Sequence, residues 1–148
     1  ADISAWNVGK VTTMSEMFYN AISFNGNISS WDVSQVKSMD LMFNSAKSFN
    51  ADLSSWNVSQ VENFHQMFFR AIAFVGDGLS GWNLHNAVNM ASMFKAATIF
   101  NQDLCEWGAK MANVPDAASV KDMFIDGACP NKSNPVQNAT GEWVGPLC

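Results

Sequence analysis

Hydrophobic positions recur along this chain with a period close to 25 residues. Tryptophan marks the period, and a Met-Phe pair follows each tryptophan at a similar distance. Self-similarity of this kind indicates one structural unit that is stacked several times. The tryptophans are Trp6, Trp31, Trp56, Trp82 and Trp107, and the pairs begin at Met17, Met42, Met67, Met93 and Met123.

Within one repeat the pattern predicts two elements. The apolar residues of segment 36–46 are spaced as on one face of a helix, and Ser34 and Ser59 suit helix N-caps in successive repeats. Segment 49–56 is rich in Asn, Asp and Ser around a single aliphatic residue, and it predicts a turn and a short strand. The helix-face residues are Val36, Met39, Met42, Phe43 and Ala46.

A unit of one strand, one turn and one helix cannot bury its apolar side alone, and stacking buries that side in ladders. We therefore expect an α/β solenoid of about five 25-residue strand-turn-helix coils over residues 1–127. Residues 128–148 are expected to form an irregular C-terminal cap. Because the chain begins within a repeat, it is expected to be the C-terminal part of a longer array.

The equivalent positions of the repeats predict columns of side chains. The Trp column is expected in the core, with a sugar-stacking platform as the alternative. A second core column contains Ile3, Ile28, Leu53, Leu79 and Leu104. The asparagines at Asn25, Asn50 and Asn101 are expected to form a ladder that bonds to turn backbone. Cation binding is the alternative, but one carboxylate per repeat does not supply the converging oxygens that calcium needs.

Composition excludes several classes of function. The 148 residues are 48% hydrophobic and 14% charged with a net charge of −5, which is typical of a folded domain. The few Lys and Arg residues are scattered, which argues against nucleic-acid binding, and no apolar run is long enough for a membrane span. His65 and His85 occupy non-equivalent repeat positions, and no nucleophile, phosphate-loop or metal motif occurs. We therefore expect no catalytic residues, no metal and no cofactor.

The repeat motif Phe-Asn-x-[Asp/Asn]-[Ile/Leu]-Ser-x-Trp-[Asp/Asn]-Val-x-x-Val-x-x-Met-x-x-Met-Phe-x-x-Ala resembles the BspA-like leucine-rich repeats of surface proteins. The segment Asn101 to Trp107, followed by further cysteines, is similar to the last repeat of secreted, algal-type members. The resemblance implies a right-handed, leucine-rich-repeat-like stack and an extracellular or cell-surface setting. It also implies a role in adhesion or binding. The chain departs from the motif at Phe64, at Ala87 and over residues 75–78.

The cysteines and sequons support an oxidising, extracellular compartment. Cys105 and Cys129 are expected to form a disulfide, because one coil returns the chain to its starting point. Cys148 is then left for a downstream or intermolecular partner, and a Cys129–Cys148 pair is the main rival. Candidate glycosylation sites are Asn131, Asn138 and Asn57, with Asn27 as the poorest of the four sequons.

The third repeat carries apolar residues beyond those that its core positions require. Phe69, Ile72 and Val75, with Arg70 beside them, are expected to be partly exposed at one corner and to form a contact surface. Its cover is expected to be a partner, a neighbouring copy, or the chain's own C-terminal tail. The expected function is a non-enzymatic extracellular or cell-surface protein that presents a binding surface to a protein or glycan. The alternative is a self-associating structural subunit of a surface layer, matrix or filament.

Overall fold

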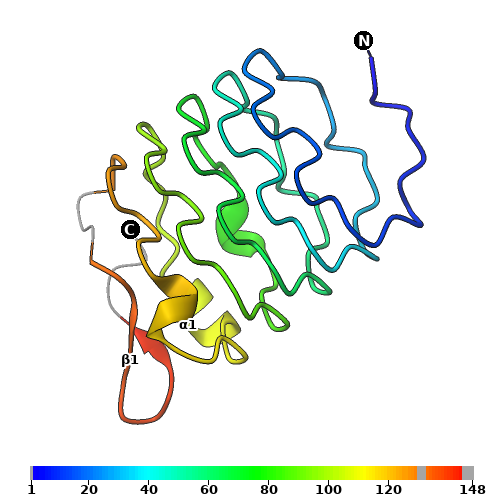
Figure 1. The fold of residues 1–148 in the computed structure, drawn as a ribbon. Helices are drawn as coiled ribbons and strands as arrows, with labels where there is room; N and C mark the ends of the chain where they lie inside the picture. The colour runs from blue at the N-terminus through cyan, green and yellow to red at the C-terminus, as the bar shows by residue number, and fades with distance from the viewer. Residues whose placement is uncertain (1, 130–132, 145–148) are drawn as a thin grey trace.

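The computed structural model describes residues 2–129 and 133–144. The chain winds through successive coils that lie side by side, one repeat to a coil, in chain order from the N-terminal end to the C-terminal end (Figure 1). The coils consist mostly of turns and irregular backbone. Parallel bridges connect equivalent residues of neighbouring coils, namely Thr13, Ser38, Asn63 and Asn89.

The prediction of an α/β, leucine-rich-repeat-like solenoid of strand-turn-helix coils is wrong. The only α-helix in the described residues is α1, Trp107–Lys110, and the two 3-10 helices are η1, Leu79–Gly81, and η2, Ala117–Val120. The only sheet among them is an antiparallel pair of strands, β1, Val136–Gln137, and β2, Trp143–Val144. The expected helix over residues 36–46 and the expected strand over residues 49–56 are both turn and loop.

The predicted helices do not form because their backbone amides bond to the next coil. In the first coil the N–H groups of Met14, Glu16, Phe18 and Asn20 donate to carbonyl oxygens one repeat later, at distances of 2.7–2.9 Å. The intervening amides close turns within the coil, as Met17 N–H does on the Met14 carbonyl. An α-helix would keep these bonds within one segment and leave neighbouring coils unconnected.

Each coil also contains two residues in the left-handed region, four positions apart, which interrupt any right-handed helix. None of them is glycine, although a non-glycine residue in this region costs about 1–2 kcal/mol. In the first four coils the amides of these residues donate to the next coil, and in the fifth the Asp122 amide donates to Asn134 Oδ1, so these bonds and burial of the adjacent apolar residues offset that cost. The two columns are Glu16, Leu41, Gln66, Ser92 and Asp122, and Asn20, Ser45, Arg70, Ala96 and Asp126.

Ser34 and Ser59 are not helix N-caps. The backbone amide of Ser34 donates to Asp32 Oδ1 at 3.0 Å, and that of Ser59 donates to Asn57 Oδ1 at 3.2 Å. Both serines therefore follow the turn-forming residue in side-chain-to-backbone turns, which reverse the chain without starting a helix.

The core is a set of stacked aromatic columns. Phe43 and Phe49 stack within one coil with ring centroids 3.8 Å apart, and Phe43 stacks on Phe68 of the next coil at 5.7 Å. The same pairing repeats along the described coils, so each ring contacts both its own coil and its neighbours. This continuous packing replaces the regular secondary structure that usually supports a core.

The predicted Trp column is confirmed as part of the core at four of its five positions. Trp31, Trp56, Trp82 and Trp107 are buried, whereas Trp6 in the first coil is 54% exposed. Each buried indole Nε1 donates to the carbonyl oxygen of the aliphatic column one repeat earlier, at 2.9–3.1 Å. Ile3, Ile28, Leu53, Leu79 and Leu104 of that column are buried, as expected.

The last coil is closed by elements outside the repeat. The β1–β2 hairpin projects beyond the stack at its C-terminal end, shown in red in Figure 1. Trp143 of β2 is buried, and β2 packs against α1. Among the described residues no helix is both long and apolar enough to cross a membrane.

Candidate functional site

A hollow of about 430 Å³ crosses one corner of four successive coils. Its lining comes from two outward-facing columns, two and four positions after the phenylalanine of each Met-Phe pair. The residue between these columns is a buried alanine in the second, third and fourth coils, so its two neighbours project outward. We name this site the basic hollow; it is lined by Asn20, Ser45, Lys47, Arg70, Ile72, Ala96 and Thr98.

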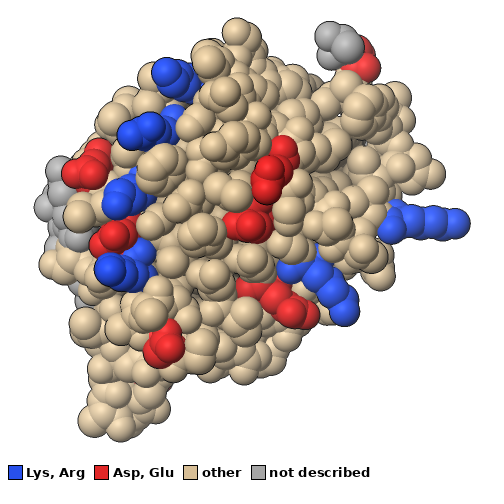
Figure 2. All heavy atoms as spheres, viewed as in Figure 1, with Lys and Arg blue, Asp and Glu red and all other residues tan. Residues whose placement is uncertain are grey.

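The charge of the basic hollow comes from Lys47 and Arg70, and its lining contains no carboxylate. Neither cation has an ion-pair partner within the described part of the chain. The Arg70 guanidinium lies 5.2 Å from the centroid of the Phe69 ring, which restricts its position. Figure 2 shows a row of Lys and Arg side chains along this side of the molecule, with acidic side chains beside its lower part.

Exposed apolar side chains surround the cations of the basic hollow. Ile72 is 42% exposed within it, and Ile22 occupies the equivalent position in the first coil. Tyr19 and Ile99 lie one position away from the lining columns and are also exposed. Apolar surface of this kind, with an arginine beside it, is typical of a contact region.

Two of the four predicted contact residues, Arg70 and Ile72, line the basic hollow. Phe69 is half-buried beneath Arg70, and Val75 is half-buried with its amide donating to Asn50 Oδ1. Sequence reasoning compared Lys47 with Ile72, its equivalent in the third repeat, but left Lys47 out of the contact surface because it took only the apolar departures as candidates. The use of these residues in association stays a prediction.

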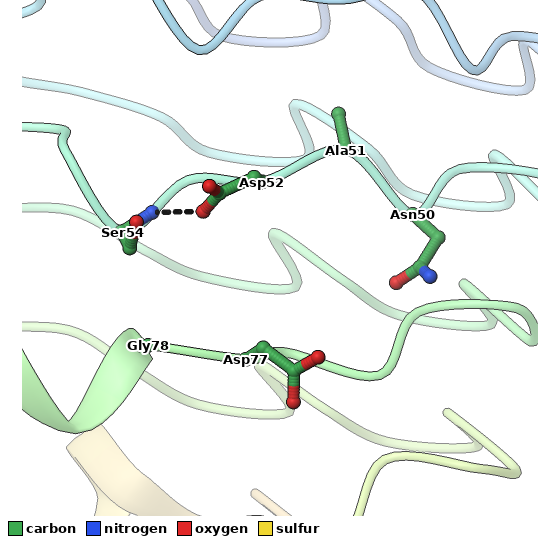
Figure 3. Close-up of a pocket in the computed structure, with 6 residues that line it drawn as sticks. All are labelled: Asn50, Ala51, Asp52, Ser54, Asp77 and Gly78. Carbon is green, nitrogen blue, oxygen red and sulfur yellow. Dashed lines mark hydrogen bonds between the residues drawn. The ribbon is translucent and has the colours of Figure 1, made fainter.

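A second hollow, of about 400 Å³, lies where the turns of the second and third coils face the start of η1. Figure 3 shows the carboxylates of Asp52 and Asp77 in this region. The backbone amide of Ser54 donates to Asp52 Oδ1 at 2.9 Å, and Gln102 Nε2 donates to Asp77 Oδ1 at 3.2 Å. We name this site the acidic groove; it is lined by Asn50, Ala51, Asp52, Ser54, Asp77 and Gly78.

Glycines at residues 76 and 78 allow the close packing beside the acidic groove. Both have positive φ, and a Cβ at Gly76 would lie 2.3 Å from the Phe100 ring. A Cβ at Gly78 would lie 2.5 Å from Ser54 Cβ. The departure from the repeat motif at residues 75–78 therefore lets this coil, which is one residue longer than its neighbours, pack as closely as they do.

The predicted asparagine ladder is confirmed between the first three coils. Asn25 Oδ1 accepts from the Asn50 amide at 2.8 Å, and Asn50 Oδ1 accepts from the Val75 amide at 2.9 Å. The carboxylates of Asp52 and Asp103 instead bond within their own coil, and each accepts from the backbone amide two residues later. These hydrogen bonds hold the pKa values of both carboxyl groups below the usual value of 3.8.

The two histidines do not form a shared site. His65 Nδ1 lies 2.9 Å from Asp40 Oδ1 of the preceding coil, whereas His85 is exposed and its backbone carbonyl accepts from Asn113. Over residues 2–129 and 133–144, no group of three or more His, Cys, Asp or Glu residues is placed to hold a metal ion.

The prediction of a Cys105–Cys129 disulfide is wrong. Cys105 is an exposed free thiol, whereas Cys129 is buried and disulfide-bonded. Cys105 follows Asp103 in an outward turn of the fifth coil, so its side chain does not enter the core where Cys129 lies. A hydrogen bond to Asp103 and its negative charge raise the pKa of the Cys105 thiol above 9.0. Cys148 lies outside the described residues.

The candidate glycosylation sites differ in accessibility. Asn57 is exposed, and Asn138 is half-buried with its amide nitrogen donating to Glu142 Oε2 at 3.0 Å. Asn27 is exposed and accepts from Ser29. Asn131 lies outside the described residues, and the occupancy of all these sites stays a prediction.

The stacked aromatic coils and the outward columns define a class of repeat protein that presents side chains on a continuous surface. The chain belongs to the family described as Mycoplasma protein of unknown function, DUF285, whose model matches residues 1–107 and 42–136. No curated protein and no solved structure matches the chain.

Proposed function

We propose that this chain is a non-enzymatic extracellular or cell-surface recognition module of the BspA-like kind, and that the basic hollow contacts a partner protein. The observation that carries the proposal is the combination of exposed Ile72 with Lys47 and Arg70, which have no ion-pair partner among the described residues, in one hollow. Exposed apolar area is unfavourable in water, and two cations without partners add specificity for an acidic ligand.

A protein partner is favoured over a glycan because the expected sugar platform is not accessible. Four of the five Trp rings are buried, and their indole N–H groups already donate to backbone carbonyls. The basic hollow is lined by two cations and two aliphatic side chains beside Asn20, Ser45 and Thr98, and the cations and aliphatic side chains suit carboxylate and aliphatic side chains of a protein. A disulfide at Cys129 supports an oxidising setting, since such bonds persist outside the cytosol.

The test uses the labelled chain on an array of purified serum and extracellular-matrix proteins beside an array of neutral and acidic glycans. We expect binding to one or more proteins, and the double variant Arg70→Glu/Ile72→Ser should weaken it at least about tenfold, which corresponds to about 1.4 kcal/mol. The matched control is Lys10→Glu/Val88→Ser, because Val88 is 40% exposed and lies outside the hollow.

Binding to glycans alone, or equal loss in the control variant, would contradict the proposal. Both double variants should melt at the temperature of the parent, since the changed side chains are exposed. Antibody labelling of intact, unpermeabilised cells that express the protein tests the surface location independently. Labelling only after permeabilisation would place the protein inside the cell.

A further inference from the structure

Residues 133–144, the part of the C-terminal segment that the structure describes, do not line the basic hollow. In Figure 1 the hairpin projects at the lower left, whereas the coil corners that carry residues 20, 45–47, 70–72 and 96–98 lie along the upper left. Trp143 of the hairpin is buried, and β2 packs against α1 at the end of the stack. The described tail is thus not the cover of the hollow within one copy.

The outward face of the hairpin has two aliphatic side chains and a carboxylate. Val136 and Val144 are cross-strand partners, and they are 56% and 39% exposed. Glu142 directly precedes β2 and is two residues from Val144, so the alternation of an extended chain places it on the side of Val144, opposite to buried Trp143. Glu142 Oε2 accepts from Asn138 Nδ2 at 3.0 Å and from Thr140 Oγ1 at 3.3 Å, so the carboxylate is fixed beside the turn of the hairpin.

We propose that the outward face of this hairpin docks into the basic hollow of a second copy of the chain. The hairpin projects from the stack (Figure 1), and the hollow of about 430 Å³ offers a recess for it. The Glu142 carboxylate is complementary to Lys47 and Arg70, and Val136 and Val144 supply apolar area for Ile72. This inference rests on the proposed function and names the partner of the same site.

The contact joins two different surfaces of the chain and is therefore heterologous. Each assembly retains a free hairpin at one end and a free hollow at the other, so association continues unless the rotation closes a ring. Copies on one surface would form a layer or filament, and copies on facing surfaces would hold those surfaces together.

Light scattering coupled to size-exclusion chromatography tests the proposal on the 148-residue chain over increasing concentration. We expect a mass that rises above the 16.2 kDa of one copy. The hollow variant Lys47→Glu/Arg70→Glu and the hairpin variant Glu142→Lys should each raise the concentration for half-association at least about tenfold. Lys10→Glu and Glu62→Lys are matched controls, because both residues are exposed outside the two surfaces.

Mixing the two charge-reversed variants gives the decisive result. The hairpin that carries Glu142→Lys then faces a hollow with two glutamates, and the unchanged hairpin of the other variant faces an unchanged hollow, so association should return. Val136→Ser keeps the Asn138–Glu142 bond and should also weaken association. This second hairpin variant tests the contact even if Glu142→Lys unfolds the hairpin.

A mass of one copy for the parent at every concentration would overturn the proposal, as would a mixture that fails to associate while both variants melt like the parent. A single-copy parent that still binds array proteins through Arg70 would leave the proposed function intact and reject only the second copy as partner. A parent chain that neither self-associates nor binds any array protein would reject both the docking of a second copy and the proposed function.

Discussion

The indole Nε1 of Trp56 donates a hydrogen bond to the Ile28 carbonyl oxygen, 3.1 Å away in the preceding coil. This bond satisfies two polar groups that burial removes from water, and it fixes the register of neighbouring coils. The same relationship connects Trp31 to Ile3, Trp82 to Leu53 and Trp107 to Leu79. Each of these four tryptophans thus contributes both packing and a specific inter-coil contact.

Replacing Trp56 by alanine should destabilise the protein by roughly 3–5 kcal/mol, as large-to-small core changes do. The loss combines a cavity between stacked coils with an unsatisfied carbonyl at Ile28. Chemical denaturation monitored by circular dichroism measures the change. Trp6→Ala is the matched control, because Trp6 is 54% exposed, and it should cost less than about 1 kcal/mol. Similar losses in both variants would contradict the assignment of Trp56 to the core.

The Gly76→Ala variant should lose roughly 1–3 kcal/mol of stability. Its Cβ would lie 2.3 Å from Phe100, and its φ of +83° is unfavourable for any residue with a side chain. Gly81→Ala is the control, since a Cβ there would meet nothing within 4 Å and its φ is not left-handed. Thermal melting compares the two, and an unchanged melting temperature for Gly76→Ala would show that the coil relaxes around the new methyl group.

Acid should destabilise the protein through the carboxylates in its turns. Hydrogen bonds from Ser54 lower the pKa of Asp52, and hydrogen bonds from Ser34 lower that of Asp32. A lowered pKa in the folded state contributes stability above the unfolded value of 3.8, and that contribution is lost as the pH falls through the folded pKa. Melting temperatures between about pH 6 and about pH 2 should therefore fall at the acidic end.

The double variant Asp32→Asn/Asp52→Asn should reduce this acid dependence. Asparagine still accepts the turn hydrogen bond, as Asn57 does from Ser59, but it does not titrate. Near neutral pH the variant should melt close to the parent. A pH profile that is as steep as that of the parent would assign the acid sensitivity to other groups.

The free thiol of Cys105 should react slowly with iodoacetamide for an exposed cysteine. The hydrogen bond to Asp103 and its charge raise the thiol pKa, so less thiolate is present near neutral pH. Asp103→Asn should lower that pKa and increase the alkylation rate at about pH 8, measured by mass spectrometry. Glu106→Gln is the control and should change the rate less. Equal rates in the parent and Asp103→Asn would contradict the role of Asp103.

The sequence identified which residues are equivalent, and hence the columns that are buried. The 25-residue period aligns Trp31 with Trp56 and Phe43 with Phe68. In the structure Phe43 stacks on Phe68, and Trp31 and Trp56 make the same indole hydrogen bond to the preceding coil. It also identified the corner that carries Ile72, because Phe69, Ile72 and Val75 are apolar where the second repeat is polar, and Arg70 lies beside them. Lys47 became part of the site only when coils were placed side by side, since it is 23 residues from Arg70.

The sequence did not determine the backbone of the coil. Buried residues at Val33, Val36 and Met39 are three apart, and this spacing fits both one helix face and a series of three-residue turns. Left-handed φ angles at Leu41 and Ser45 decide between them, and neither residue type signals such a conformation. Which conformation forms depends on whether the amides bond along the segment or to the next coil.

The chain by itself therefore determined the period, the core columns and the absence of a long apolar span, because these follow from which side chains avoid water. Only the tertiary structure decided that residues 36–46 form turns in place of a helix, that Cys105 is free, and that the hairpin with Glu142 projects from the stack. The physical reason is that a backbone amide bonds to a carbonyl that lies next to it in space. In this fold the inter-coil carbonyl is 24 to 29 residues away in the sequence, so local sequence does not reveal it.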